Sequence, residues 1–213
     1  RKEALVDEWG VKYSKDGRRL LKASRKLNGT YSIKEGVRII CDNAFEGCTS
    51  LSSFVIPDGV TSIGDMAFMD CSFLNSVVIP DGVTSIGGGA FSGCESLSNL
   101  VIPDSVTFIG HDAFDNTKWY RNNNDDYVIL SDKYLIKYRG KNENTIIPKS
   151  VKYISPYAFD RCKHLKSTTI PNGIKVIESF SFSGCSNIKS IIIPDSVEKI
   201  SEYAFINCKK LES

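Results

Sequence analysis

Residues 71–91 read CSFLNSVVIPDGVTSIGGGAF, and this stretch decides the fold. Its first part carries apolar side chains at Leu74, Val77 and Ile79, on one side of a short extended run. A Pro-Asp-Gly turn follows directly, and a second short extended segment comes after it. The last part, 87–93 around Ala-Phe, is long enough for about one helical turn. One such unit has almost no hydrophobic core of its own.

The same pattern returns every 23 residues in two series, one before and one after the segment 119–146, which indicates a repeat protein. An isoleucine before the proline recurs at Ile56, Ile79, Ile102, Ile147, Ile170 and Ile193. A phenylalanine recurs at Phe45, Phe68, Phe91, Phe114, Phe159, Phe182 and Phe205. Ile33 extends the first series backward, with Lys34 in the proline position. Stacked units can share a continuous core, so we predict a solenoid in which each phenylalanine packs on the next.

The sequence also has a longer period of 114 residues, because Phe45 corresponds to Phe159 and Cys71 to Cys185. Two segments outside the repeats, 11–22 and 128–137, both read as strand, polar turn, strand, and each predicts a β-hairpin. We expect the first hairpin to cover the first coil with apolar side chains from Trp9, Val11, Tyr13, Leu20 and Leu21. The expected organisation is a hairpin cap (1–32), a first array (33–118), a hairpin insertion (119–146) and a second array (147–213).

The combination of Ile-Pro, Ala-Phe and Cys-x-x-Leu at this period resembles the BspA-like leucine-rich repeats of the Treponema pallidum type. The resemblance covers residues 33–114 and 147–213, with local departures at Lys34, Thr117 and Ser181. It implies an α/β repeat solenoid with short parallel strands and short helical turns, interrupted by β-hairpin segments. It also implies a bacterial or protist protein of the cell surface or the extracellular space, which binds a protein or glycan without catalysis.

Composition excludes several other classes of protein. The chain has 213 residues, 41% of them hydrophobic, and no apolar run approaches the ~18 residues of a membrane helix, so membrane insertion is not expected. The net charge of +2 is too small for a phosphate-binding field over the whole surface, so nucleic acid is not an expected partner. No charged-then-apolar leader precedes Trp9, so a signal peptide is expected to be absent or already removed.

Six of the seven cysteines share one offset within the repeat, at Cys48, Cys71, Cys94, Cys162, Cys185 and Cys208. Equivalent side chains of successive coils point the same way, whereas a disulfide needs converging Cβ atoms, so we expect a column of free buried thiols. Cys41 lies outside this column, and both a buried and a partly exposed thiol remain open for it. Neither His111 nor His164 recurs with the cysteines, so no metal site and no cofactor is expected.

The candidates for catalytic motifs are weak. His111 and His164 both fall where a solvated outer turn is expected, and neither has an evident nucleophile as partner. The glycines at 87–89 lack the Lys-Ser/Thr of a phosphate-binding loop and suit a coil corner where side chains have no room. We therefore expect no catalytic residues and no enzyme activity.

One candidate binding surface remains. The outward position before each Ile-Pro carries a β-branched residue, and these residues form a predicted stripe along the sheet: Val55, Val78, Val101, Ile146, Thr169 and Ile192. The stripe could bind a ligand, or its residues could simply suit a parallel sheet. Charge is uneven as well, with a net −9 over residues 39–120 between basic flanks of +6 and +5. This distribution would favour a basic ligand or weak end-to-end contacts between monomers, unless it is only a solvated face.

Two hypotheses for function follow. The first is a non-enzymatic recognition module, extracellular or at the cell surface, that presents its sheet face to a protein or glycan. The second is a structural spacer or intracellular scaffold in which no face is specialised for a ligand.

Overall fold

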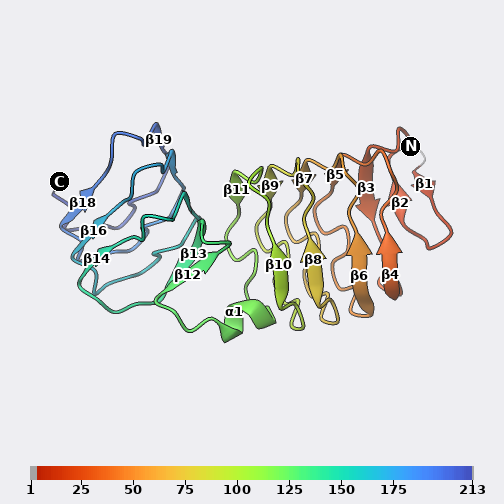
Figure 1. Ribbon diagram of the computed structural model, residues 1–213, viewed down its shortest axis with the longest axis horizontal. Coiled ribbons are helices and arrows are strands. Elements are labelled where there is room, and N and C mark those ends of the chain that lie inside the picture. Colours follow the sequence, from red (N-terminus) through yellow and green to blue (C-terminus); the bar gives the residue numbers. More distant parts are fainter. Residues whose placement is uncertain (1–3, 213) are drawn as a thin grey trace. The chain divides into compact units, whose positions relative to one another are not determined.

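The structure, a computed structural model, describes residues 4–212 (Figure 1). The chain divides into two compact units, Arg1–Asn123 and Asn124–Ser213, which are called unit 1 and unit 2 here. Each unit is a stack of coils, and each coil contributes two short strands to two separate rows. The boundary between the units falls inside the segment 119–146, so the hairpin of that segment belongs to unit 2.

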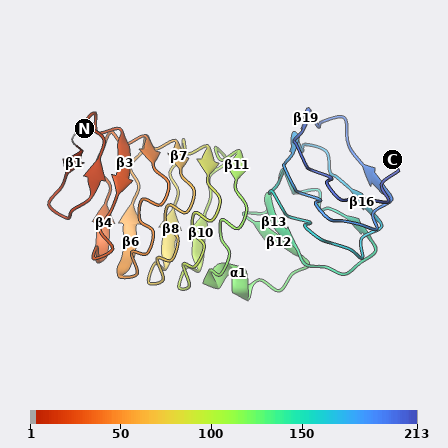
Figure 2. The ribbon, with the colours of Figure 1, turned by 180° about the vertical axis from the view of Figure 1, so that it is seen from behind.

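Unit 1 has two rows of strands, which lie side by side along the stack in both views (Figure 1, Figure 2). The back row is a seven-stranded sheet whose order is β1 (Leu5–Val6), β2 (Lys12–Tyr13), β3 (Arg19–Lys22), β5 (Ile39–Ile40), β7 (Ser62–Ile63), β9 (Ser85–Ile86) and β11 (Phe108–Ile109). The front row consists of β4 (Gly29–Ser32), β6 (Leu51–Val55), β8 (Ser76–Val78) and β10 (Asn99–Val101). Within the front row, β4 pairs with β6 and β8 with β10, both in parallel.

Unit 2 repeats this arrangement on a smaller scale. The hairpin of β12 (Tyr127–Leu130) and β13 (Tyr134–Tyr138) is antiparallel, and β13 continues in parallel to β15 (Tyr153–Ile154). A parallel pair, β17 (Val176–Ile177) and β19 (Lys199–Ile200), belongs to the next coils. The front row is a three-stranded parallel sheet in the order β14 (Asn144–Ile146), β16 (Ser167–Thr169) and β18 (Ser190–Ile192).

The predicted column of phenylalanines forms the core of each unit. In unit 1 the ring of Phe91 lies 5.2 Å from Phe68 and 5.7 Å from Phe114, and all three rings are nearly parallel and fully buried. In unit 2 the ring of Phe182 lies 4.8 Å from Phe159 and 5.5 Å from Phe205. The solenoid prediction is therefore confirmed: each coil closes its core only against the coil next to it.

The helical turns expected around Ala-Phe do not form, and the α/β description is replaced by a β-solenoid. Alternate backbone N–H groups there donate to the following coil, as from Phe68 to Ala90 O and from Asp70 to Ser92 O, so they cannot serve a helix. Left-handed residues such as Met66 (φ 53°) and Asp70 (φ 60°) also break the helical path. The described residues contain one short helix, α1 (Lys118–Asn122).

Both predicted hairpins form, and the first one covers the stack as expected with three buried side chains, Val11, Tyr13 and Leu20. The expectation for Trp9 was wrong, because 62% of its surface is exposed. The chain turns away from the core at this point: the Asp7 carboxylate accepts hydrogen bonds from the backbone N–H groups of Trp9 and Val11 and so holds a tight turn.

Two departures from the repeat have local explanations. Lys34 stands where other coils have proline, and its ammonium lies over the Tyr13 ring, a contact that proline could not make. Thr117 replaces the cysteine of the fourth coil, and its hydroxyl donates to Phe114 O and accepts from Tyr120 N–H. Thr117 is thus the N-cap of α1, which closes the end of the unit 1 column by setting Trp119 edge-on against Phe114.

Candidate ligand-binding surface

The front row of unit 1 carries three residues of the predicted stripe. Successive side chains of a strand point to opposite faces, so Val77 is buried whereas Val78 faces outward. The exposed fractions of the three valines are 54% for Val55, 69% for Val78 and 60% for Val101. Val78 and Val101 are direct partners in the register of β8 and β10. The structure therefore brings these valines together as an apolar strip on the outer face of unit 1.

The other three residues of the stripe lie on the front row of unit 2. Ile146, Thr169 and Ile192 are aligned by the register of β14, β16 and β18. The two isoleucines are more than 60% exposed, and Thr169 is half-buried between them. A groove of about 530 Å³ runs along these residues, and Lys149 and Lys152 also line it. The six predicted positions thus form one strip in each unit.

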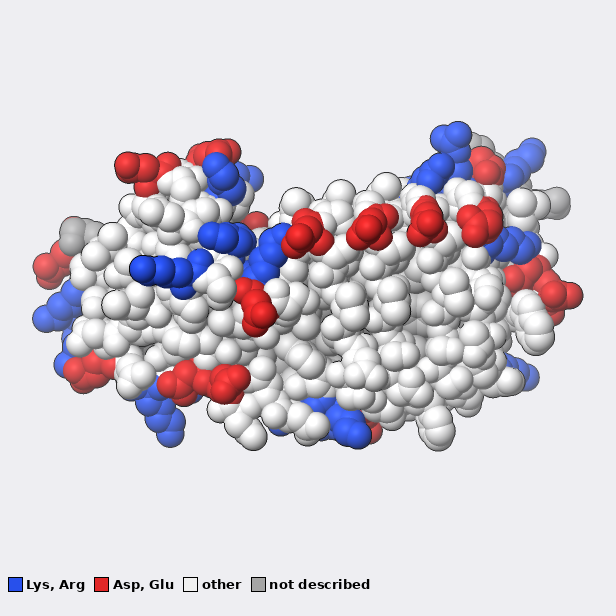
Figure 3. All heavy atoms as spheres, viewed as in Figure 1, with Lys and Arg blue, Asp and Glu red and all other residues white. Residues whose placement is uncertain are grey.

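Charged turns border these strips, and they differ between the units. Three residues after each outward position of unit 1 stands an exposed acidic residue; the series is Glu35, Asp58, Asp81 and Asp104. Figure 3 shows acidic side chains in a row along one edge of unit 1. The same positions in unit 2 are occupied by Lys149, Asn172 and Asp195. The strip of unit 1 therefore has an acidic border, whereas the strip of unit 2 has a mixed border.

The cysteines form the predicted column inside the stack. The thiols of Cys71 and Cys94 donate to the carbonyl oxygens of Phe45 and Phe68 at 3.2 and 3.1 Å, so each ties its coil to the preceding one. Cys185 and Cys208 do the same in unit 2. Burial raises the pKa of Cys48 to about 12, which keeps that thiol neutral and unreactive. Cys41, for which two interpretations were open, is partly exposed.

The two histidines and the glycine run at 87–89 lie at turns of the coils. His111 is exposed, as expected, but the expectation for His164 was wrong: it is half-buried, with its ring 6.3 Å from that of Tyr138. The run at 87–89 is confirmed as a coil corner, because a Cβ on Gly87 would lie 2.5 Å from the Asp65 nitrogen. Within residues 4–212, no three histidine, cysteine or acidic side chains come together as they would around a metal ion.

Sequence reasoning missed a second aromatic column in unit 2. The rings of Tyr157, Phe180 and Tyr203 stack at 4.9 and 5.3 Å on the outer turns, and 57% of Tyr203 is exposed. All three have φ near +60°, where bulky residues are rare. The equivalent positions of unit 1 hold Asn43, Met66, Gly89 and Asp112. The 23-residue period could have shown this column, because the three aromatic residues share one offset.

Two rows of short parallel strands around a continuous column of side chains define a β-solenoid of the leucine-rich-repeat class. The sequence matches the BspA type leucine rich repeat region in six copies, over residues 23–124 and 132–213, and the chain belongs to this family. Within the described part of the chain, no helix has the length and apolar composition needed to cross a bilayer.

Comparison with solved structures found matches that cover nearly the whole chain. A leucine-rich repeat protein of T. pallidum is 26% identical with a TM-score of 0.50, over 99% of this chain and 87% of that one. A leucine-rich repeat protein of Bacteroides ovatus is 27% identical with a TM-score of 0.48, over 99% and 50% of the chains. A leucine rich cell surface protein of Faecalibacterium prausnitzii is 23% identical with a TM-score of 0.36, over 100% and 94%. A comparison with curated proteins found no match.

Proposed function

We propose that this protein is a non-enzymatic binding and adhesion module that recognises a protein or glycan through the front faces of its solenoid. The observation that carries the proposal is the exposure of the apolar strips. The side chains of Val55, Val78 and Val101 are more than half exposed in adjacent coils, where threonine would suit a solvated sheet equally well. An apolar strip with a charged border is typical of a protein interaction surface.

The borders suggest a different role for each strip. The acidic turns beside the valine strip of unit 1 would speed the approach of a basic ligand and would lose this effect at high salt. The groove of unit 2, with Lys149 and Lys152 at its wall, suits a ligand with an acidic or polar group beside an apolar one. Membership of the leucine-rich repeat family supports a binding role in general, and we place the module at the cell surface or outside the cell.

The test replaces valines of unit 1 by charged residues and compares ligand capture. Purified protein is applied to a glycan array and to immobilised extracellular-matrix proteins, and every ligand captured is measured again with the double variant Val78→Asp, Val101→Asp. The matched control is Met66→Asp, since Met66 is an apolar side chain, 41% exposed, on an outer turn where the next coil but one has Asp112.

We expect the double variant to lose at least about tenfold in affinity, because two carboxylates would be desolvated against the ligand. Met66→Asp is expected to bind like the wild type. If circular dichroism shows all variants folded and the double variant captures every ligand as well as the control does, the front face of unit 1 is not the binding surface. Binding would then use another surface, such as the strip of unit 2, whereas failure of the wild type to capture any ligand would support the spacer hypothesis.

A further inference from the structure

The front row of unit 1 begins with an open sheet edge. β4 pairs with β6 only on one side, where the backbone N–H of Ile33 donates to Val55 O at 3.0 Å and that of Gly29 to Ser50 O at 3.1 Å. Alternate residues of a strand direct their backbone groups to opposite edges, so those of Thr30 and Ser32 face away from β6. No strand of residues 4–212 pairs with this outer edge of β4.

In unit 2, the equivalent edge of the front row has a hydrogen-bond partner from the same chain. The residue 114 positions after Ser32 is Ile146, on the first front strand of unit 2. Its backbone carbonyl, which points away from the neighbouring strand β16, accepts a hydrogen bond of 3.1 Å from the Tyr127 hydroxyl. The chain therefore supplies its own partner at the edge of β14. In unit 1, the described residues offer no equivalent partner for the carbonyl of Ser32.

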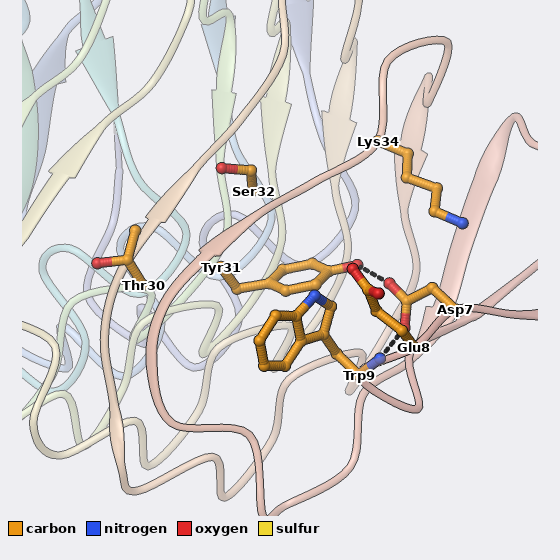
Figure 4. A pocket seen from close by; sticks show the side chains of 7 residues that line it. All are labelled: Asp7, Glu8, Trp9, Thr30, Tyr31, Ser32 and Lys34. Atoms are coloured by element: carbon orange, nitrogen blue, oxygen red, sulfur yellow. Dashed lines mark hydrogen bonds between the residues drawn. The ribbon is translucent and has the colours of Figure 1, made fainter.

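A groove of about 450 Å³ lies against the open edge of β4, with Asp7, Glu8 and Trp9 on its other side (Figure 4). In this view the side chain of Tyr31 points toward Asp7 and Trp9, whereas those of Thr30 and Ser32 point to the opposite side of the strand. The open edge of β4 is thus bordered by the exposed aromatic side chain of Trp9 and by the acidic side chain of Glu8.

Hydrogen bonds hold this wall of the groove in place. The Asp7 carboxylate accepts from the backbone N–H of Trp9 at 3.0 Å, from that of Val11 at 2.8 Å and from the Tyr31 hydroxyl at 2.6 Å. Tyr31 is itself buried and hydrogen-bonded to the Tyr13 hydroxyl. The turn that presents Trp9 is therefore anchored to β4, so that the distance between Trp9 and the edge is fixed before any ligand arrives.

The chemistry of the groove selects an extended, basic segment. Unpaired backbone donors and acceptors on a sheet edge bind another strand, because an extended peptide satisfies both kinds of group at once. Glu8 is exposed and has no ion pair within the described residues, and an indole beside a carboxylate suits a lysine or arginine side chain. The ammonium of Lys34, by contrast, is directed over the Tyr13 ring, 5.1 Å from its centre, and lies apart from Trp9 (Figure 4).

We propose that the outer edge of β4 binds an extended peptide segment of a partner protein as an added strand, with a lysine or arginine of that segment placed between Trp9 and Glu8. This site is separate from the strips of the proposed function, since it uses the backbone edge of the front sheet rather than its outward side chains. It can therefore exist whether or not the valine strip binds a ligand.

The test uses a blocked pentapeptide, acetyl-TVKVT-amide, titrated into isotope-labelled protein. We expect amide signals of Thr30 and Ser32 and the indole N–H of Trp9 to shift together, and hydrogen exchange at the Ser32 amide to slow. A peptide with N-methyl groups at alternate residues cannot form the ladder and should bind roughly tenfold more weakly, and so should the peptide in which glutamate replaces lysine.

Protein variants distinguish the contribution of the β4 backbone to peptide binding from the contribution of the side chains. Ser32→Pro removes an N–H on the open edge and leaves the bonds to β6, which proline tolerates on an edge strand; Ser32→Ala keeps this N–H and is the matched control. We expect Ser32→Pro, Trp9→Ala and Glu8→Gln each to weaken peptide binding several-fold, and Ser32→Ala to bind like the wild type.

Three outcomes would overturn the proposal. The first is a folded Ser32→Pro variant that binds as well as Ser32→Ala. The second is equal binding of the N-methylated and unmodified peptides, which decides the matter even if Ser32→Pro does not fold. The third is a shift of the Trp9 indole by a soluble oligosaccharide such as chitohexaose while the pentapeptide shifts nothing, which would assign the groove to a glycan.

Discussion

Removing one ring from the phenylalanine column of unit 1 should destabilise the whole unit. Phe91 is fully buried and stacks on Phe68 at 5.2 Å and on Phe114 at 5.7 Å, so Phe91→Ala deletes two ring contacts and leaves a cavity between coils. Truncation of a buried phenylalanine costs about 3–5 kcal/mol. We expect a loss at the upper end of this range, because the neighbouring coils cannot collapse without breaking their backbone bonds to each other.

Urea unfolding monitored by circular dichroism measures this loss. For chains of this size the free energy of unfolding falls by about 2–3 kcal/mol per molar urea, so the midpoint for unit 1 should drop by about 1.5–2.5 M. The fluorescence of Trp119, in a Trp9→Phe background, reports the same unit, because this indole lies edge-on to the Phe114 ring at 6.0 Å.

The matched control is Phe73→Ala, which removes the same ring from a position that is 68% exposed. Its effect should stay within about 0.5 kcal/mol. A solenoid is stabilised by contacts between neighbouring coils. The unfolding midpoint of Phe91→Ala measured by Trp119 fluorescence should therefore differ from the midpoint measured by circular dichroism. Equal midpoints for Phe91→Ala and Phe73→Ala would refute the idea that the column stabilises the stack.

Two further predictions concern titratable groups. Burial raises the pKa of the Glu178 carboxyl, and Lys199 lowers it by a smaller amount. As pH rises from about 4 to about 7 the unfolded chain loses this proton first, so folding stability falls, and Glu178→Gln should gain stability over the wild type across this range. A difference in urea midpoint that does not change with pH would contradict this. Burial also raises the pKa of Cys48 to about 12, whereas Cys41 is partly exposed, so iodoacetamide at pH about 8 should label Cys41 in the folded protein and Cys48 only after denaturation, as read by mass spectrometry. Equal labelling rates for the two thiols would show that the coil around Cys48 opens readily.

The 23-residue period by itself determined the solenoid, the column of Phe68, Phe91 and Phe114, and the column of cysteines. These features depend only on which side chains recur at one offset, since equivalent residues of stacked coils must lie above one another. The alternation of a strand likewise determined that Val78 faces outward, because the buried Val77 precedes it.

The tertiary structure alone decided how the coil turns and how the stack begins. A run such as 65–70 is long enough for a helical turn, but alternate backbone N–H groups of the run bond to the next coil, and a sequence does not state which carbonyl a donor will choose. The exposure of Trp9 and the open edge of β4 depend in the same way on where the Asp7 carboxylate meets Tyr31, 24 residues along the chain. Such contacts between distant residues have no period, so only the folded chain shows them.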